Sequence, residues 1–225
     1  MNFSEFDKAI SLPRLGKYLR ASKGNKNLAL RLYRYNIKLC QRFYGILSIF
    51  EVVFRNAIND HMKKQLSDPN WLATQGKKGF LSKYRNTITI EHKKLIKSKK
   101  YSNDRLLSTM SFGVWTYLFT RRCYNNSGKT LLRIFQAKPF GLNQNHIYNE
   151  LNEIRIFRNR IAHHEPLCFD SNGNIDLTQS EKIQGLVLDY LSYLGYEPNK
   201  ILYGIERPNS VLEKINRLKK SIESI

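Results

Sequence analysis

Apolar residues recur along this chain mostly at intervals of three and four residues, and few runs alternate between apolar and polar positions. That period places apolar side chains on one face of an α-helix. The clearest cases are the stripe from Ile183 to Leu194 and the stripe from Val211 to Ile222. We therefore predict an all-α fold with helices almost throughout.

Capping residues, prolines and glycines set the expected helix boundaries. Ser11 is an expected cap before Leu12 and Pro13, Asn25 or Asn27 is expected to cap the next helix, and Asn143 a later one. Helices are expected over residues 12–22, 25–66, 82–100, 103–122, 128–136, 143–163, 183–194 and 209–223. The 25–66 segment is either one very long helix or two stacked ones, because only Gly45 interrupts it, and the 103–122 segment is either one helix or two that meet at Gly113. Residues 67–79 and 165–176 are expected to be loops.

No repeat period and no long linker divides the sequence, so we expect one helical domain over residues 1–225. The composition is that of a globular protein: 41% of residues are hydrophobic and 25% are charged. Lys and Arg total 38 against 18 Asp and Glu, a formal net charge of +20. This composition excludes disorder as the main state, and the charge points to a polyanionic partner.

The most apolar run, residues 45–54, is too short to cross a bilayer and contains Glu51, and the N-terminus lacks a signal-peptide pattern. We expect a cytoplasmic protein that has no membrane partner. Cys40, Cys123 and Cys168 are widely spaced, which favours buried thiols over disulfides or a zinc cluster. We expect no metal and no cofactor.

Basic residues are concentrated in two segments. Residues 8–50 contain ten Lys or Arg and no Asp or Glu, and residues 77–100 contain nine basic residues and one Glu. Such segments neutralise phosphates and give salt-sensitive affinity for nucleic acid. The candidate RNA-binding residues are Arg31, Arg34, Lys38, Arg42, Lys93, Lys94, Lys97, Arg121, Arg122, Arg155 and Arg160.

Other interpretations of the charge remain open. A solvated basic surface and a membrane surface are both alternatives, although the helices lack the wide apolar face of an interfacial helix. A helical DNA-binding regulator is a further alternative, but no compact helix-turn-helix pattern is present. The 13 tyrosines and 12 phenylalanines stand mainly at core spacing, so we assign no stacking platform to them.

One segment, residues 150–167, combines arginines and histidines near an expected helix end. Arg158 falls on the apolar arc made by Ile147, Leu151, Ile154 and Ile161, where an unpaired charge would be costly. Asn159 and His163 share one side of the same helix. His163 and His164 are adjacent and diverge, unlike the same-face pair of a His-Glu-x-x-His metal site.

Two explanations of this segment are possible. Arg158 forms a buried ion pair while His163 caps the negative end of the helix dipole. Alternatively, the imidazole of His163 moves protons at an RNA 2′-hydroxyl or 5′-oxygen while Arg158 holds the phosphate, a reaction that needs no metal. Glu51 and Arg55 form a one-turn pair on the long helix, and Glu51 is a possible partner of Arg158.

Five segments resemble a known family in their order along the chain: AISLPRLGKYL, ALRLYRYNIKL, EVVFRNAI, SFGVWTYLF and LNEIRIFRNRIAHHEPL. Over residues 9–167 the chain is similar to the bacterial abortive-infection Abi-like (AbiD/AbiF) proteins, which are placed in the HEPN superfamily. The resemblance implies a HEPN-like helical bundle, here with additional N-terminal and C-terminal helices. It also implies a metal-independent ribonuclease cleft formed between two protomers.

The resemblance implies residue roles as well. The superfamily motif falls on Arg158, Asn159 and His163, with His164 as a neighbour of unclear role, and the Abi-like motif falls on Glu51, Arg55 and Asn56. The expected function is a phage-defence endoribonuclease toxin, a homodimer that leaves a 2′,3′-cyclic phosphate and is bound to or regulated by a structured RNA. The alternative is a non-catalytic RNA-binding regulator of the same fold.

Overall fold

The computed structural model describes residues 3–224, and among these the chain forms α-helices and short 3-10 helices but no β-strand. The prediction of an all-α fold is confirmed. The helices are α1 (Phe3–Ile10), α2 (Leu12–Ala21), α3 (Lys26–Leu66), α4 (Trp71–Lys78), η1 (Ser82–Tyr84), α5 (Arg85–Lys97), α6 (Asn103–Ser108), α7 (Phe112–Tyr117), α8 (Arg121–Asn126), η2 (Leu131–Ile134), α9 (Gln144–Ala162), α10 (Thr178–Tyr193), α11 (Pro198–Ile201) and α12 (Asn209–Glu223).

The described residues group into two compact units. Unit 1 comprises residues 3–48, Phe157–Gly185 and residues 202–224, and unit 2 comprises Ile49–Ile156 and Leu186–Ile201. The helices α3, α9 and α10 contribute residues to both units. The expectation of a single domain over the whole chain stays a prediction.

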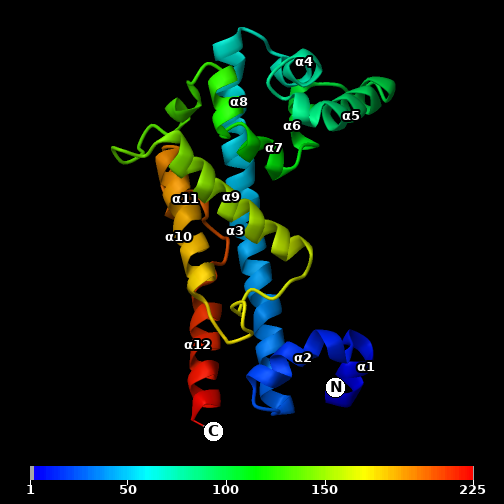
Figure 1. Ribbon diagram of the computed structural model, residues 1–225, viewed down its shortest axis with the longest axis vertical. Helices are drawn as coiled ribbons and strands as arrows, with labels where there is room; N and C mark the ends of the chain where they lie inside the picture. Colours follow the sequence, from blue (N-terminus) through cyan, green and yellow to red (C-terminus); the bar gives the residue numbers. More distant parts are fainter. Residues whose placement is uncertain (1–2, 225) are drawn as a thin grey trace. The chain divides into compact units, whose positions relative to one another are not determined.

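Helix α3 is one unbroken helix of 41 residues, coloured from blue to cyan in Figure 1. Its first turn is capped by Asn25, whose side-chain oxygen accepts hydrogen bonds from the backbone N–H groups of Asn27 and Leu28, both at 3.1 Å. Gly45 does not break the helix. A Cβ atom at that position would stand 3.0 Å from Ile205, so the glycine permits close packing within unit 1.

Several predicted boundaries are wrong. Residues 67–79 are not only a loop, because Trp71, Leu72 and Ala73 are buried along α4. Gly76 does not mark a turn: a Cβ atom there would lie 2.8 Å from Ile88 of α5, so the glycine lets the two helices approach. Ser11 precedes α2 as expected, but its side chain makes no capping hydrogen bond and its φ is +79°.

The segment 103–122 is neither one helix nor two that meet at Gly113, because Gly113 lies inside α7. It contains α6, α7 and the start of α8. Ser102 caps α6 by accepting from the backbone N–H of Arg105 at 3.2 Å. The hydroxyls of Thr109 and Thr120 each donate to a backbone carbonyl three residues earlier, at 2.8 Å in both cases. Such local bonds compete with the helix and end it. The predicted helix at 128–136 is the 3-10 turn η2, and α1 and α11 were not predicted.

Residues 165–176 form the expected loop, closed by an isolated antiparallel bridge between Phe169 and Ile175. The turn inside the bridge contains Asn172 and Gly173, with Gly173 at φ +85°. The side chain of Asp170 accepts hydrogen bonds from the backbone N–H groups of Asn172 and Asn174, at 2.9 and 2.8 Å. This bonding to backbone N–H groups is typical of Asp in turns.

The core of unit 1 joins α2, α3, the end of α9 and α12. The rings of Phe43 and Phe157 meet edge to face at 4.7 Å, and the ring of Tyr18 contacts those of Tyr33 and Phe169, both at 5.1 Å. The expected stripe of α12 is confirmed as buried and consists of Val211, Leu212, Ile215, Leu218 and Ile222.

The core of unit 2 is a cluster of aromatic rings around Phe54 of α3. Phe54 stacks on Phe50 at 5.5 Å and on Phe119 at 5.7 Å, and the ring of Phe135 joins them to Tyr190 of α10. The hydroxyl of Tyr190 donates to a side-chain oxygen of Glu150 at 2.7 Å. The buried hydroxyl of this tyrosine is thereby satisfied.

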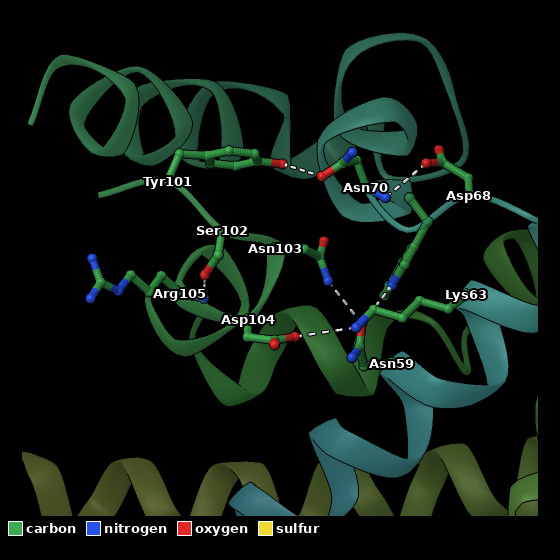
Figure 2. Close-up of polar contacts among 10 residues, drawn as sticks. Asn59, Lys63, Asp68, Asn70, Tyr101, Ser102, Asn103, Asp104 and Arg105 are labelled. Carbon is green, nitrogen blue, oxygen red and sulfur yellow. Dashed lines mark hydrogen bonds and ion pairs between the residues drawn. The ribbon is translucent and has the colours of Figure 1, made fainter. Parts of the chain in front are cut away.

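A buried polar junction fastens the short helices of unit 2 to α3. The side-chain oxygen of Asn59 accepts hydrogen bonds from the indole N–H of Trp71 and from the amide of Asn103, both at 3.0 Å. Figure 2 shows Asn59 and Asn103 together with the nearby ion pair between Lys63 and Asp104, which measures 3.2 Å. One acceptor therefore organises the starts of both α4 and α6.

Replacing Asn59 with leucine leaves the buried donors of Trp71 and Asn103 without an acceptor. Each such loss costs about 1–3 kcal/mol, so we expect Asn59→Leu to lower the free energy of unfolding by about 3 kcal/mol. Urea unfolding followed by circular dichroism measures the change. Asn125→Leu, at an exposed position of α8, is the matched control and should change stability by less than about 0.5 kcal/mol. Equal stability of the two variants would contradict the role of Asn59.

The three cysteines are free thiols, with Cys123 and Cys168 buried and Cys40 half-buried. Burial raises the pKa of the Cys40 thiol to about 11 and the pKa values of the Cys123 and Cys168 thiols to about 12. The raised pKa values keep these thiols in the neutral form at neutral pH, and the predicted burial is confirmed for Cys123 and Cys168. None of the helices within residues 3–224 is both long enough and apolar enough to span a bilayer.

Candidate functional site

The candidate site lies at the end of α9, and the start of that helix is set as predicted. The side-chain oxygen of Asn143 accepts from the backbone N–H of His146 at 3.0 Å. The fully buried stripe of α9 is Ile147, Leu151, Ile154 and Phe157. Arg158 is half-buried beside that stripe instead of within it, because Phe157 occupies the core-facing position. The prediction that Arg158 lies on the buried arc is therefore wrong by one residue, because the buried position belongs to Phe157.

The chain leaves α9 through a well-defined turn. The backbone N–H of Glu165 donates to the carbonyl of Arg160 at 2.8 Å, and that of His164 donates to the carbonyl of Ile161 at 3.0 Å. This pair of bonds is the Schellman motif, which satisfies carbonyls that the helix leaves without partners. His163 stands just after the last helical residue, Ala162, and its side chain is exposed.

His164 occupies the position of this motif that normally holds glycine, and its φ is +58°. A side chain in this left-handed conformation costs about 1–2 kcal/mol for most residues, and histidine tolerates it better than most. The carbonyl of His164 accepts a hydrogen bond from the guanidinium of Arg14 at 2.6 Å, which ties α2 to the turn. The turn is therefore fixed by contacts outside its own segment.

Further contacts of unit 1 hold the residues that follow. The guanidinium of Arg160 donates to the side chain of Gln179 and to the carbonyl of Pro166, and it lies 3.6 Å from a carboxylate oxygen of Glu165. The buried side-chain oxygen of Asn36 on α3 accepts from the backbone N–H of Leu167 at 2.8 Å. Sequence reasoning missed Arg14, Asn36 and Gln179, because only the fold brings them to this turn.

The three motif residues belong to the last turns of α9 and to unit 1. Arg158 and Asn159 are half-buried and His163 is exposed, and the carbonyl of Asn159 accepts from the backbone N–H of His163 at 2.9 Å. They lie within about one and a half helical turns of each other. An exposed imidazole, an amide and a guanidinium thus stand on one short segment at the surface of unit 1, a set suited to anion binding and proton transfer.

Because glycine adopts positive φ without strain, we expect His164→Gly to raise the free energy of unfolding by about 1 kcal/mol. The hydrogen bond from Arg14 survives, since it goes to the backbone. Thermal and urea unfolding measure the gain. The control is His163→Gly, at a position outside the left-handed region, which should be neutral or destabilising. A loss of stability in His164→Gly would contradict the backbone strain that we assign to His164.

The second predicted group, Glu51, Arg55 and Asn56, lies on α3 in unit 2. Glu51 and Arg55 are half-buried and Asn56 is exposed. Their role stays a prediction, and so does the pairing of Glu51 with Arg158.

The predicted RNA-binding residues also fall into both units. On α3, Arg31, Arg34 and Lys38 are exposed, whereas Arg42 is half-buried and forms an ion pair with Glu206. The candidate residues of unit 2 that are exposed are Lys93, Lys94, Lys97, Arg121 and Arg122. Of the α5 lysines, Lys94 forms an ion pair with Glu91 at 2.6 Å.

The two arginines of α9 in this set are engaged by neighbouring side chains. Arg155 donates to the side-chain oxygen of Asn152 from two nitrogens, at 3.0 and 2.7 Å, and Arg160 holds the turn as described above. Their contact with RNA stays a prediction. Across residues 3–224, no group of three or more His, Cys, Asp or Glu side chains is arranged to hold a metal ion.

Fold and site together define a strongly basic, all-α protein with an arginine and histidine motif at the end of a helix. Comparison with protein families gives a match to the family described as Abi-like protein, over residues 3–168. The chain belongs to this family, and membership implies a role in abortive infection, a form of phage defence. No curated protein and no solved structure matches the chain.

Proposed function

We propose that this protein is an endoribonuclease toxin of phage defence, of the HEPN type. The observation that supports it best is the exposed imidazole of His163, held directly after α9 and within two turns of Arg158. A histidine that served only the core would be buried, whereas the side chain of His163 is exposed. The Schellman turn that follows fixes the backbone from which this imidazole projects.

The proposed reaction is a transesterification within RNA. The 2′-oxygen attacks the adjacent phosphorus while its proton passes to an imidazole, and the bond from phosphorus to the 5′-oxygen breaks as that oxygen receives a proton. The products are a 2′,3′-cyclic phosphate and a 5′-hydroxyl. Histidine suits both proton transfers because its ordinary pKa is close to neutral pH.

Arg158 is the proposed phosphate-binding group. Its planar guanidinium offers two parallel donors to the phosphate oxygens and stabilises the charge that builds up in the transition state. Asn159 and His164 are proposed to orient the phosphate and the imidazole. The active form is proposed to be a homodimer, in which the imidazole of one protomer is the base and that of its partner is the acid.

The direct test is to incubate purified protein with RNA in the presence of EDTA. Cleavage should persist, because the proposed proton transfers use side chains alone. Loss of cleavage on chelation, restored by added metal ions, would contradict the proposed mechanism.

A second candidate function, a non-catalytic RNA-binding regulator, is favoured by one observation. Arg31, Arg34 and Lys38 all lie exposed on the first turns of α3, in a segment without acidic residues. A regulator of this kind binds structured RNA with steep salt dependence and without cleaving it. Tight binding of intact RNA by a protein that never produces cyclic phosphate ends would favour this function over the nuclease.

A further inference from the structure

Unit 1 contains a groove between α1 and the first turns of α3, far along the chain from the histidine motif. Its volume is about 790 Å³, and its lining includes Phe3 and Phe6 of α1 together with Arg31, Arg34, Tyr35 and Lys38 of α3. This volume falls within the range of about 300–1,000 Å³ that is typical of small-molecule sites. No acidic residue contributes to its lining.

Three of the four aromatic residues that line the groove are not core residues. Phe3, Phe6 and Tyr35 are only half-buried, whereas the fourth, Tyr33, is buried and meets the ring of Phe6 edge to face at 5.5 Å. Helix α1 has no fully buried residue at all. Aromatic side chains therefore line an accessible groove, although helical spacing alone had assigned such residues to the core.

The cations of the groove are already positioned on these rings. The guanidinium of Arg34 lies 5.9 Å from the ring centre of Phe6, and that of Arg31 lies 5.7 Å from the ring centre of Tyr35. The Nε atom of Arg31 also donates to the hydroxyl of Tyr35 at 3.2 Å. Such contacts order long side chains before a ligand arrives, which reduces the entropy lost on binding.

We propose that this groove binds an unpaired nucleotide of RNA. The base stacks against the ring of Phe6 or Tyr35, and the flanking phosphates meet Arg31, Arg34 and Lys38. Stacking on aromatic rings requires a base that is not already stacked in a duplex, so single-stranded segments or loops are the ligands that fit. This inference names the class of RNA recognised and rests on the proposed function only in taking RNA as the partner.

Two other occupants fit the groove less well. A second copy of the chain would have to place acidic side chains against the three cations of the groove, and it has only 18 Asp and Glu against 38 Lys and Arg. An acidic peptide would satisfy the cations but offers no flat ring for Phe6 and Tyr35. The combination of aromatic faces and positive charge is characteristic of single-stranded nucleic acid binding.

The test measures fluorescence anisotropy with a labelled 12-nucleotide single-stranded RNA and with the blunt duplex of the same sequence. All proteins carry His163→Ala, so that cleavage does not interfere. Phe6→Leu keeps the apolar contact of α1 but removes the ring, and we expect it to weaken single-strand binding about tenfold and duplex binding little. Arg34→Gln should weaken the binding of both RNAs and lower the slope of log affinity against log salt by about 1.

Matched controls come from exposed positions of unit 1 outside the groove. Tyr203 is 90% exposed, so Tyr203→Leu removes an aromatic ring, and Lys214→Gln on α12 removes one exposed charge. Both should leave single-strand affinity unchanged. Circular dichroism of Phe6→Leu checks that α1 and the remaining helices are retained.

Three results would overturn the inference: unchanged single-strand affinity in Phe6→Leu, an equal loss for duplex and single strand, or competition by poly-glutamate as strong as that by RNA. Failure of the nuclease proposal is separate. If the wild-type protein does not cleave RNA while Phe6→Leu weakens binding as expected, the groove assignment stands and the catalytic assignment falls. If the wild-type protein cleaves RNA while Phe6→Leu binds single strands as tightly as its parent, the catalytic assignment stands and the groove assignment falls.

Discussion

His163→Ala should reduce the rate of RNA cleavage by about 10²–10⁴-fold, the usual effect of removing a positioned acid or base. The imidazole is the group proposed to move protons at the 2′-oxygen and the 5′-oxygen, and no other histidine lies in the motif except His164. Because His163 is exposed, its removal opens no cavity, and the unfolding transition should stay where it is. Single-turnover cleavage of end-labelled RNA measures the rate.

The matched control is His146→Ala, which removes another exposed imidazole of α9, here near the first turn and paired with Glu150 at 3.0 Å. Its cleavage rate should remain within twofold of wild type. RNA affinity of His163→Ala should also be nearly unchanged. Cleavage by His163→Ala at the wild-type rate would remove the catalytic role of this residue.

Arg158→Ala should lower cleavage by about 10²–10³-fold, because it removes the donor pair that we propose stabilises the charge of the transition state. Arg158→Lys keeps the charge but loses the planar fork, so it should recover only part of the activity. In cells, a growth defect caused by expression of the wild-type protein should disappear with Arg158→Ala.

Arg217→Ala, which removes an exposed arginine of α12, is the control for a general loss of positive charge. It should cleave RNA and inhibit growth like the wild type. Because Arg158 is half-buried, its replacement can lower stability. Circular dichroism therefore measures the folded fraction of each variant, and activities are compared per folded molecule. Undiminished toxicity of a folded Arg158→Ala protein would favour the RNA-binding regulator.

The helical class and the longest helices could be predicted from the sequence because their cues are local. A three-to-four-residue period and an Asn cap identify the start of α3, and the stripe of α12 was predicted at every buried position. Local cues failed where tertiary packing decided the outcome. Gly76 lies inside α4 at a position where a side chain would clash with Ile88 of α5. The hydroxyls of Thr109 and Thr120 bond to the backbone and end short helices in a segment whose apolar period suggested a longer one.

The candidate site divides in the same way. The positions of Asn159 and His163 on one helix end follow from helical geometry, but the burial of Phe157 in place of Arg158 depends on the ring of Phe43 across unit 1. Arg14 donates to the carbonyl of His164, and Asn36 accepts from the backbone N–H of Leu167; these hydrogen bonds join residues 150 and 131 positions apart in the sequence. No pattern within the motif indicates such partners.

The most direct test of the central claim, a histidine-driven attack by the 2′-oxygen, is the analysis of product ends from matched RNA and DNA substrates in EDTA. The account predicts that RNA yields 2′,3′-cyclic phosphate and 5′-hydroxyl ends and that DNA of the same sequence is untouched. Cleavage of the DNA, or RNA products ending in a 5′-phosphate and a 3′-hydroxyl, would contradict it.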